Sequence, residues 1–491
     1  MKKYSFRGFI LLLVLGLIIP IAGSVGAEDP VGRGPALGSQ AKSRPEPTLS
    51  QGNASHWIRA YYFFPSGLAG DDYYSATSLL PTGDGGFVVA GNILHLFPYP
   101  PGGSTQISLI MGVQSSGAID WQFFCQDVPP NVRNIALSSL VRTQDGGYLA
   151  AGSMGSDESP GSYIMAMKIS PEGRVDWFNK YGITNTYRVS AAATNDGGAV
   201  LTAGTGSDRS HLDEDIWVAR IGPAGNIIWQ QVMGTDDLDL PNAIQPTPEE
   251  GFLIVGSQGS WDYPGNGCVI KLDPNGQMEW NKLLHFDSDY NGGEADAIVC
   301  EPDGSFMVSG LAGDSCDCGG GYWAWVFKMD PSGGMIWQAG YDSKTSSYGP
   351  FGLMISGDGG YLFTQRSSAY KITSSGEPQW QTTYTDAEVG AAIPTEQGGF
   401  ALAVVLGSPY AIGVMNLDEK GTIGTPCPLI QTALPDSWET SAKVLSGSYA
   451  IRKTNAQVQS FNYHPSSRPC LVKMICAQVP RLASDPPGRI R

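Results

Sequence analysis

The chain has 491 residues, of which 42% are hydrophobic and only 15% are charged. Such a composition allows a large buried core and excludes a disordered chain. The formal net charge of −16 argues against nucleic acid or an anionic membrane as the partner, because both are themselves negatively charged.

Residues 1–27 have the pattern of a secretory signal peptide. Two lysines and an arginine precede an apolar run, residues 8–23, and the small residues Val25, Gly26 and Ala27 follow it. An uncleaved anchor helix is the alternative. No other stretch is long and apolar enough to span a bilayer. We therefore expect a protein that is secreted, periplasmic or on the cell surface, with no membrane insertion after signal removal.

The rest of the chain divides into three parts. Residues 28–56 are rich in Pro, Gly and Ser and are predicted to form a flexible linker. Residues 57–425 contain a repeat, and residues 426–491 form a C-terminal extension without it.

One unit recurs seven times, and three markers within it stay in step. The first is a turn of the Asp-Gly-Gly-aromatic type, whose first-glycine position falls at Gly85, Gly146, Gly197, Glu250, Gly304, Gly359 and Gly398. The second is a turn glycine followed four residues later by tryptophan, at Gly117/Trp121, Gly173/Trp177, Gly225/Trp229, Gly276/Trp280, Gly333/Trp337 and Gly376/Trp380. The third is a small residue seven positions before the first marker, at Ser78, Ser139, Ser190, Ala243, Ala297, Gly352 and Ala391. Periods of this length are typical of propellers and solenoids.

The repeat predicts an all-β fold, a seven-bladed β-propeller of four-stranded antiparallel blades. Strands such as Phe87–Ala90 and Phe252–Val255 are apolar throughout, so both of their faces should be buried between neighbouring blades. Trp57 belongs to a strand without a hairpin partner, whereas the last repeat has strand 411–417 but Thr425 in place of tryptophan. The N-terminal strand is therefore predicted to pair with 411–417 and close the ring.

Eight cysteines in an exported chain allow disulfides. A bridge from Cys427 to either Cys470 or Cys476 would fix the C-terminal extension. Cys316 and Cys318 could form a local disulfide, belong to two other bridges, or bind a metal weakly.

Antiparallel strands alternate in direction, so both tight turns of each unit should lie on one face and both long loops on the other. Variable loops on a rigid scaffold usually carry function. The predicted long-loop face is rich in acids and aromatics, including Asp71, Asp72, Tyr73, Tyr74, His211, Glu214, Asp236 and Asp239. The candidate ligand-binding residues on it are Asp213, Asp215, Asp237, Trp261, Asp262, Tyr263, Tyr322 and Trp323. Solvated acids and aromatics that cap blade edges are the alternative.

One loop has part of a calcium-binding pattern. Asp287, Asp289 and Asn291 occupy positions 1, 3 and 5, and Gly292 allows the sharp bend at position 6. Position 12 is Ile298 rather than the glutamate of an EF-hand, so an ordinary turn is the alternative. We expect no cofactor, with calcium at this loop as the alternative.

Enzyme signatures are few: the sequence has no nucleophile elbow, no zinc-binding histidine pair and no Walker loop. The Asp/Ser-x-x-Gly-x-x-x-Trp element is similar to the tryptophan-docking motif of quinoprotein dehydrogenases, although a tryptophan there can simply pack between blades. We therefore expect a non-enzymatic protein, with a quinoprotein-like oxidoreductase or a purely structural surface protein as alternatives.

The alternation of Lys-hydrophobic-Asp-x-x-Gly-x-x-x-Trp with Asp-Gly-Gly-Tyr/Phe-x-x-Ala-Gly resembles the secreted bacterial and archaeal β-propeller repeat proteins. Departures from the pattern are Ala199, Ser305 and Thr425. The resemblance implies the fold, export and a binding or scaffold role at a surface. We expect a monomer that binds a glycan, a peptide or a protein through its long-loop face.

Overall fold

A computed structural model describes most of the chain from residue 56 to residue 477. The described ranges are 56–63, 71–97, 103–125, 132–156, 162–182, 186–206, 214–259, 265–286, 291–314, 322–341, 350–407, 410–435, 437–440, 443–446, 450–453, 458–461 and 471–477. In these ranges no helix is long and apolar enough to cross a membrane.

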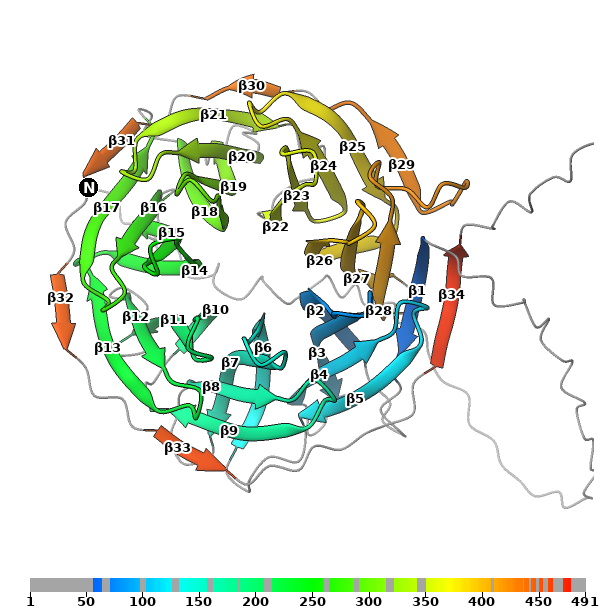
Figure 1. Ribbon diagram of the computed structural model, residues 1–491, viewed down its shortest axis with the longest axis horizontal. Helices are drawn as coiled ribbons and strands as arrows, with labels where there is room; N and C mark the ends of the chain where they lie inside the picture. The colour runs from blue at the N-terminus through cyan, green and yellow to red at the C-terminus, as the bar shows by residue number, and fades with distance from the viewer. Residues whose placement is uncertain are drawn as a thin grey trace, which may run out of the picture. The chain divides into compact units, whose positions relative to one another are not determined.

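The described residues form seven antiparallel four-stranded blades around a central axis, which confirms the predicted fold (Figure 1). Blade 1 comprises β2 (Asp71–Pro81), β3 (Phe87–Phe97), β4 (Gly103–Val113) and β5 (Ile119–Cys125). Blade 2 comprises β6 (Val132–Arg142), β7 (Tyr148–Ser156), β8 (Ser162–Ile169) and β9 (Val175–Tyr181). Blade 3 comprises β10 (Thr186–Ala193), β11 (Ala199–Gly206), β12 (Glu214–Ile221) and β13 (Ile227–Gly234). Blade 4 comprises β14 (Leu238–Pro246), β15 (Phe252–Gly259), β16 (Asn266–Leu272) and β17 (Met278–His285).

The remaining blades follow the same order from the axis outward. Blade 5 comprises β18 (Asn291–Cys300), β19 (Phe306–Asp314), β20 (Tyr322–Met329) and β21 (Met335–Tyr341). Blade 6 comprises β22 (Pro350–Ile355), β23 (Tyr361–Gln365), β24 (Ser368–Ile372) and β25 (Pro378–Tyr384). Blade 7 comprises β26 (Ala387–Pro394), β27 (Phe400–Leu406) and β28 (Ala411–Leu417), and β1 (Trp57–Tyr62) is its fourth strand.

The N-terminal strand closes the ring as predicted. β1 pairs antiparallel with β28, with Trp57 opposite Asn416 and Tyr61 opposite Ile412. Its side chains also reach blade 1, since Trp57 Nε1 donates to Ser115 O at 3.0 Å and Tyr61 Oη donates to Gly117 O at 2.8 Å. The two ends of the repeat region are thus held together by main-chain and side-chain hydrogen bonds.

Middle strands are buried on both faces, as their apolar sequences predict. Every residue of β27 and of β28 is buried. The tryptophans pack between blades: the Trp121 ring lies 6.5 Å from the Tyr148 ring of blade 2, and the Trp280 ring lies 6.3 Å from the Phe306 ring of blade 5. Each blade therefore completes the core of its neighbour.

The tight turns depend on a left-handed residue at the first-glycine position. Gly146 has φ +82° and its amide donates to Thr143 O at 3.0 Å. Glu250 occupies the equivalent position in blade 4 with φ +65°, a conformation that costs a residue with a side chain about 1 kcal/mol.

The C-terminal extension adds a fifth, outermost strand to six of the seven blades (Figure 1). We call these six strands the belt: β29 (Ile430–Ala433), β30 (Ser437–Glu439), β31 (Lys443–Ser446), β32 (Ala450–Lys453), β33 (Val458–Phe461) and β34 (Leu471–Ala477). They pair in turn with blades 6, 5, 4, 3, 2 and 7, so the belt runs around the ring against the order of the blades. In the described ranges blade 1 has four strands.

A disulfide joins the two ends of the belt. Cys427 lies just before β29 and Cys476 lies in β34, and their sulfurs are bonded across a separation of 49 residues. The pairing is one of the two predicted for Cys427, and the other candidate, Cys470, lies outside the described residues, as do Cys316 and Cys318.

A basic side chain on the third strand of a blade pairs with an acid of the tight-turn face in several blades. These ion pairs are Lys168–Asp145 at 2.8 Å, Arg220–Asp196 at 2.9 Å, Lys328–Glu301 at 2.8 Å and Lys371–Asp358 at 2.8 Å. Hydrogen bonds from Lys168 and then from Thr143 lower the pKa of Asp145 to about 2.

We expect the Lys168–Asp145 pair to be lost in acid. The folded pKa of Asp145 lies below its unfolded value of about 3.9, so the pair stabilises the fold above about pH 4 and loses its effect as the pH falls toward 2. Asp145 is 62% exposed, which limits the contribution to about 1 kcal/mol or less. Urea unfolding of Asp145→Asn should show a lower midpoint than the parent at pH 7, and the difference should vanish near pH 2. A difference that stays constant over this range would contradict the assignment.

Candidate functional site

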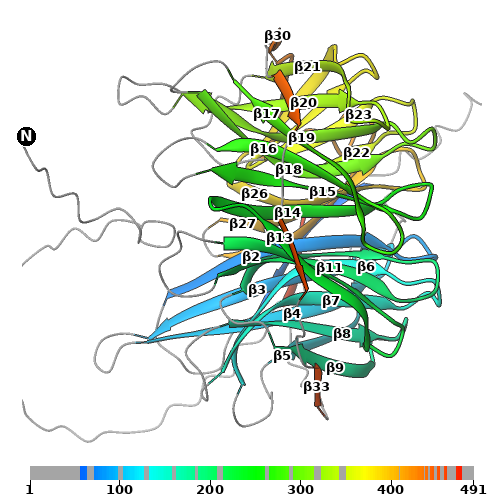
Figure 2. The same ribbon diagram turned by 90° about the vertical axis from the view of Figure 1, so that its left-hand side faces the viewer.

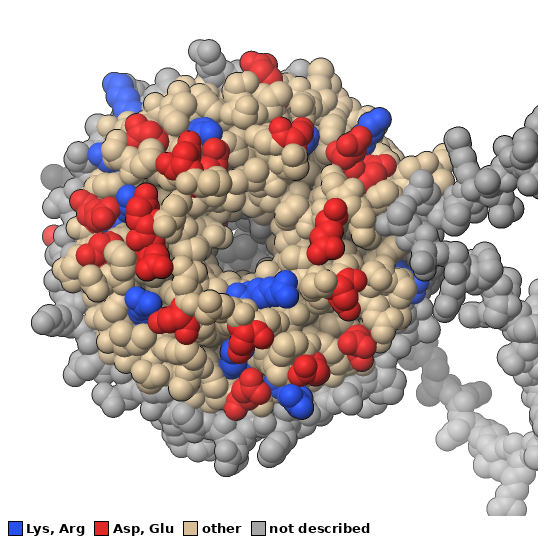
Figure 3. Space-filling model, in the orientation of Figure 1, with Lys and Arg blue, Asp and Glu red and all other residues tan. Residues whose placement is uncertain are grey.

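The two faces of the propeller differ in their connections. The tight turns gather on one face, which lies at the right in Figure 2 and toward the viewer in Figures 1 and 3. Acidic side chains are spread around this tight-turn face, with basic ones between them and an opening at the axis (Figure 3). The other ends of the strands define the long-loop face.

The structure describes about half of the predicted ligand-binding residues. Asp213, Trp261, Asp262 and Tyr263 lie outside the described residues, as do Asp287 and Asp289 of the predicted calcium loop. The backbone of Asn291 begins β18. Asp215, Asp237, Tyr322 and Trp323 are all described and lie at the long-loop ends of their strands or in the connection beside them.

These four residues do not form one cluster, since they come from two separated parts of the ring. Tyr322 and Trp323 begin β20 of blade 5, where Tyr322 is 44% exposed and Trp323 packs partly against the core. Asp215 is the second residue of β12, and Asp237 lies in the connection between blades 3 and 4. Asp237 is exposed, whereas Asp215 is 9% exposed.

Asp215 belongs to a group of buried carboxylates at the junction of blades 3 and 4. Glu214 is 1% exposed and Asp239 is fully buried. Asp239 accepts hydrogen bonds from the Thr235 amide at 2.6 Å and from Gln258 Nε2 at 2.9 Å. A Cβ on Gly234 would lie 1.8 Å from Asp215 Oδ1 and 3.1 Å from Asp239 Oδ2, so only glycine fits between these two carboxylates.

Burial changes the acidity of one of these carboxyl groups, that of Glu214. Desolvation raises the pKa of Glu214 to about 7, so its carboxyl group exchanges a proton near neutral pH. Among the described side chains, no group of three Asp, Glu, His or Cys is placed to hold a metal ion. The predicted calcium loop remains a prediction, because Asp287 and Asp289 lie outside the described residues.

Two exposed tyrosines on the long-loop face come from opposite ends of the repeat region. Tyr73 in β2 is 39% exposed and Tyr410, next to β28, is 50% exposed. Their ring centroids are 6.4 Å apart and the rings are tilted by 31°. The pair lies at the junction of blades 7 and 1, where the ring closes.

Polar side chains also meet at the axis. Arg188 of β10 contacts Asn242 of β14 and lies 3.5 Å from Glu294 of β18, while Asn242 Nδ2 donates to Asp296 Oδ1 at 3.0 Å. Burial and the neighbouring Glu294 raise the pKa of Asp296 well above its ordinary value. These contacts join the innermost strands of blades 3, 4 and 5.

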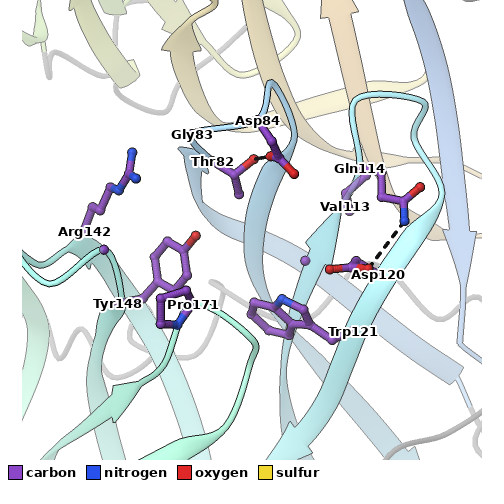
Figure 4. A pocket seen from close by; sticks show the side chains of 12 residues that line it. Thr82, Gly83, Asp84, Val113, Gln114, Asp120, Trp121, Arg142, Tyr148 and Pro171 are labelled. Atoms are coloured by element: carbon purple, nitrogen blue, oxygen red, sulfur yellow. Dashed lines mark hydrogen bonds between the residues drawn. The ribbon is translucent and has the colours of Figure 1, made fainter.

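A cleft of about 300 Å³ opens on the tight-turn face between blades 1 and 2 (Figure 4). Asp84, Asp120 and Trp121 line it from blade 1, and Arg142 and Tyr148 line it from blade 2. Gln114 Nε2 donates to Asp120 Oδ1 at 3.4 Å. This site was not predicted from the sequence, because the long, variable loops indicated function on the opposite face. The signal that could have revealed it is Gly112, which breaks the repeat of basic residues on the third strands.

No protein-family model and no curated protein sequence matches the chain. Among solved structures, it is similar to Penicillium chrysogenum alpha-L-arabinanase complexed with arabinobiose, with 12% identity over 60% of this chain and 96% of that chain and a TM-score of 0.41. It is also similar to a variant of Synechocystis apocarotenoid oxygenase, with 10% identity over 78% of this chain and 97% of that chain and a TM-score of 0.36. The WD40 domain of SCAP from fission yeast has 10% identity over 75% of this chain and 99% of that domain, with a TM-score of 0.32. Similarities at this level do not indicate what this chain binds.

Proposed function

We propose that the chain is an exported, non-enzymatic binding or scaffold protein that engages a glycan, peptide or protein ligand through its long-loop face. Export is supported by the signal-peptide pattern and by the Cys427–Cys476 disulfide, because disulfides persist mainly in oxidising compartments. The resemblance to secreted propeller repeat proteins supports the same role.

The observation that carries the proposal is the exposed pair Tyr73 and Tyr410. Exposed aromatic rings with a polar hydroxyl suit stacking against a sugar ring or a peptide side chain. The two rings lie at a fixed junction, since Trp57 and Tyr61 of blade 7 donate hydrogen bonds to Ser115 O and Gly117 O of blade 1. Their position is therefore set before any ligand arrives, which reduces the entropy cost of binding.

Glycan and peptide arrays probed with the purified protein would test this proposal. The double variant Tyr73→Ala/Tyr410→Ala should weaken any specific binding at least about tenfold, because aromatic anchors commonly contribute 1.4 kcal/mol or more. The matched control is Ile336→Ala, which removes an exposed apolar side chain that is 53% accessible on β21. Binding that resists the double variant, or falls equally in the control, would contradict the proposal.

Two further readouts separate the alternatives. Binding that falls on chelation would support calcium at Asp287, Asp289 and Asn291. A visible absorption band in the purified protein would argue instead for a quinone cofactor and an oxidoreductase.

A further inference from the structure

Five of the seven blades place a basic residue directly opposite the tryptophan of their fourth strand. The cross-strand pairs are Lys168–Trp177, Arg220–Trp229, Lys271–Trp280, Lys328–Trp337 and Lys371–Trp380. Blade 7 has Asn416 opposite Trp57, and blade 1 has Gly112 opposite Trp121. Blade 1 is therefore the blade in which this position has no side chain.

Blade 2 shows what the basic side chain does at this position. Lys168 Nζ lies 2.9 Å from Thr143 Oγ1 and 2.9 Å from Asp145 Oδ1. The Thr143 hydroxyl and the Gly147 amide donate to the same Asp145 oxygen, at 2.6 Å and 3.1 Å. A hydroxyl and a carboxylate thus form a receptor for a primary ammonium group, which Lys168 supplies from its own blade.

Blade 1 contains the same receptor. The Thr82 hydroxyl donates to Asp84 Oδ1, and the Gly86 amide donates to that oxygen at 3.3 Å. Among the described side chains no basic group forms an ion pair with Asp84. The pKa of Asp84 is lowered first by the Thr82 hydroxyl and then by the Gly86 amide, whereas Lys168 is the first cause for Asp145.

Gly112 also lines the cleft. A Cβ on Gly112 would lie only 2.5 Å from the indole of Trp121, so this ring lies directly over the glycine. Trp121 is half-buried and lines the cleft together with Asp84 (Figure 4). An indole beside a carboxylate is a favourable environment for an alkylammonium ion, because the ring attracts the cation and covers its methylene groups.

We propose that the cleft between blades 1 and 2 binds a primary alkylammonium group supplied by a ligand, with its nitrogen on Asp84 and Thr82 and its alkyl chain along Trp121. Asp120 adds a second negative charge to the cleft, and Arg142 of blade 2 adds one positive charge. The charged side chains of the cleft therefore sum to −1, which favours a monovalent cation. The site lies on the tight-turn face and is separate from the proposed ligand surface around Tyr73.

Calorimetric titration of the purified protein with n-butylamine and with the blocked tripeptide Gly-Lys-Gly would test the proposal. Asp84→Asn should weaken binding at least about tenfold, because it removes a charge-assisted hydrogen bond. Arg142→Ala should tighten binding several-fold, because it removes a like charge. The matched control is Asp358→Asn, which changes the equivalent turn of blade 6, where Ser356 and Lys371 contact the same carboxylate, and should leave binding unchanged.

A second variant, Gly112→Lys, fills the cleft with a side chain of the protein itself. Gly112→Lys should abolish binding, because the new side chain would displace the Trp121 ring that lies over Gly112 and place its own ammonium group near Asp84. A melting curve of this variant shows whether the propeller still folds. If it does not fold, the loss of binding in Asp84→Asn still tests the proposal. Equal effects of Asp84→Asn and Asp358→Asn, or binding that Arg142→Ala weakens, would overturn the proposal.

The probes also distinguish the source of the ammonium group. Binding of both probes supports a lysine side chain of a peptide, and binding of n-butylamine alone supports a free amine. The same tripeptide with an acetylated lysine should not bind, since its nitrogen carries no charge. Equal binding of the acetylated and unmodified peptides would overturn the proposal.

Discussion

Deletion of residues 28–62 is expected to abolish the cooperative folded state. The deletion removes β1, in which Trp57, Ile58 and Tyr61 are each no more than 1% exposed. Burial of such side chains contributes about 2–3 kcal/mol each, so about 6–9 kcal/mol is lost, which approaches the whole stability of a typical domain. It would also expose β28 as an open edge. Thermal unfolding monitored by circular dichroism, together with the soluble yield, would measure the effect.

The matched control is deletion of residues 28–55, which leaves β1 in place. This shorter deletion should melt like the parent protein, because it removes only the predicted linker. If both deletions melt alike, closure by β1 contributes nothing and our description of the ring is wrong.

The variant Cys476→Ala is expected to be the most destabilising single substitution in the belt. The disulfide joins two cysteines at a sequence separation of 49, and loop-closure entropy predicts a stabilisation of about 4 kcal/mol for a loop of this length. Guanidinium unfolding should show a lower midpoint for the variant, and reductant should lower the midpoint of the parent to a similar value.

Cys300→Ala serves as the control for loss of a cysteine. Cys300 is a free thiol on β18, and burial raises its pKa to about 12, so the thiol is unreactive. This variant should remain sensitive to reductant, whereas Cys476→Ala should not. A parent protein whose unfolding does not respond to reductant would contradict the role assigned to the disulfide.

The sequence was sufficient to predict the seven blades and their closure. Tight turns and inter-blade tryptophans need particular residues, such as Gly146 and Trp121, so their repetition is visible in the chain. The belt has no such requirement. Strands such as Lys443–Ser446 attach to a blade through main-chain hydrogen bonds, which almost any sequence can form, and no periodicity reveals them.

The candidate site was predicted less well, because the burial of a side chain depends on contacts with residues that are far away in the sequence. Asp215 and Asp237 look alike in the sequence, yet Asp215 is buried beside Gly234 and Asp237 is exposed. The cleft depends on Gly112, a residue whose meaning appears only after the strand register places it opposite Trp121. A missing side chain is a weaker sequence signal than a motif, although it can define a site equally well.

Formation of the Cys427–Cys476 disulfide also depends on how far the ring and the belt have assembled. Each belt strand needs the outer edge of a finished blade, so Cys476 can reach Cys427 on this path only after the chain has passed around the ring. A ring that lacked a blade, or that had not closed at β1, would leave the two thiols apart and open to other partners. In an oxidising compartment the Cys427–Cys476 bond would then mark the molecules in which the belt has paired around the ring and separate them from those in which it has not.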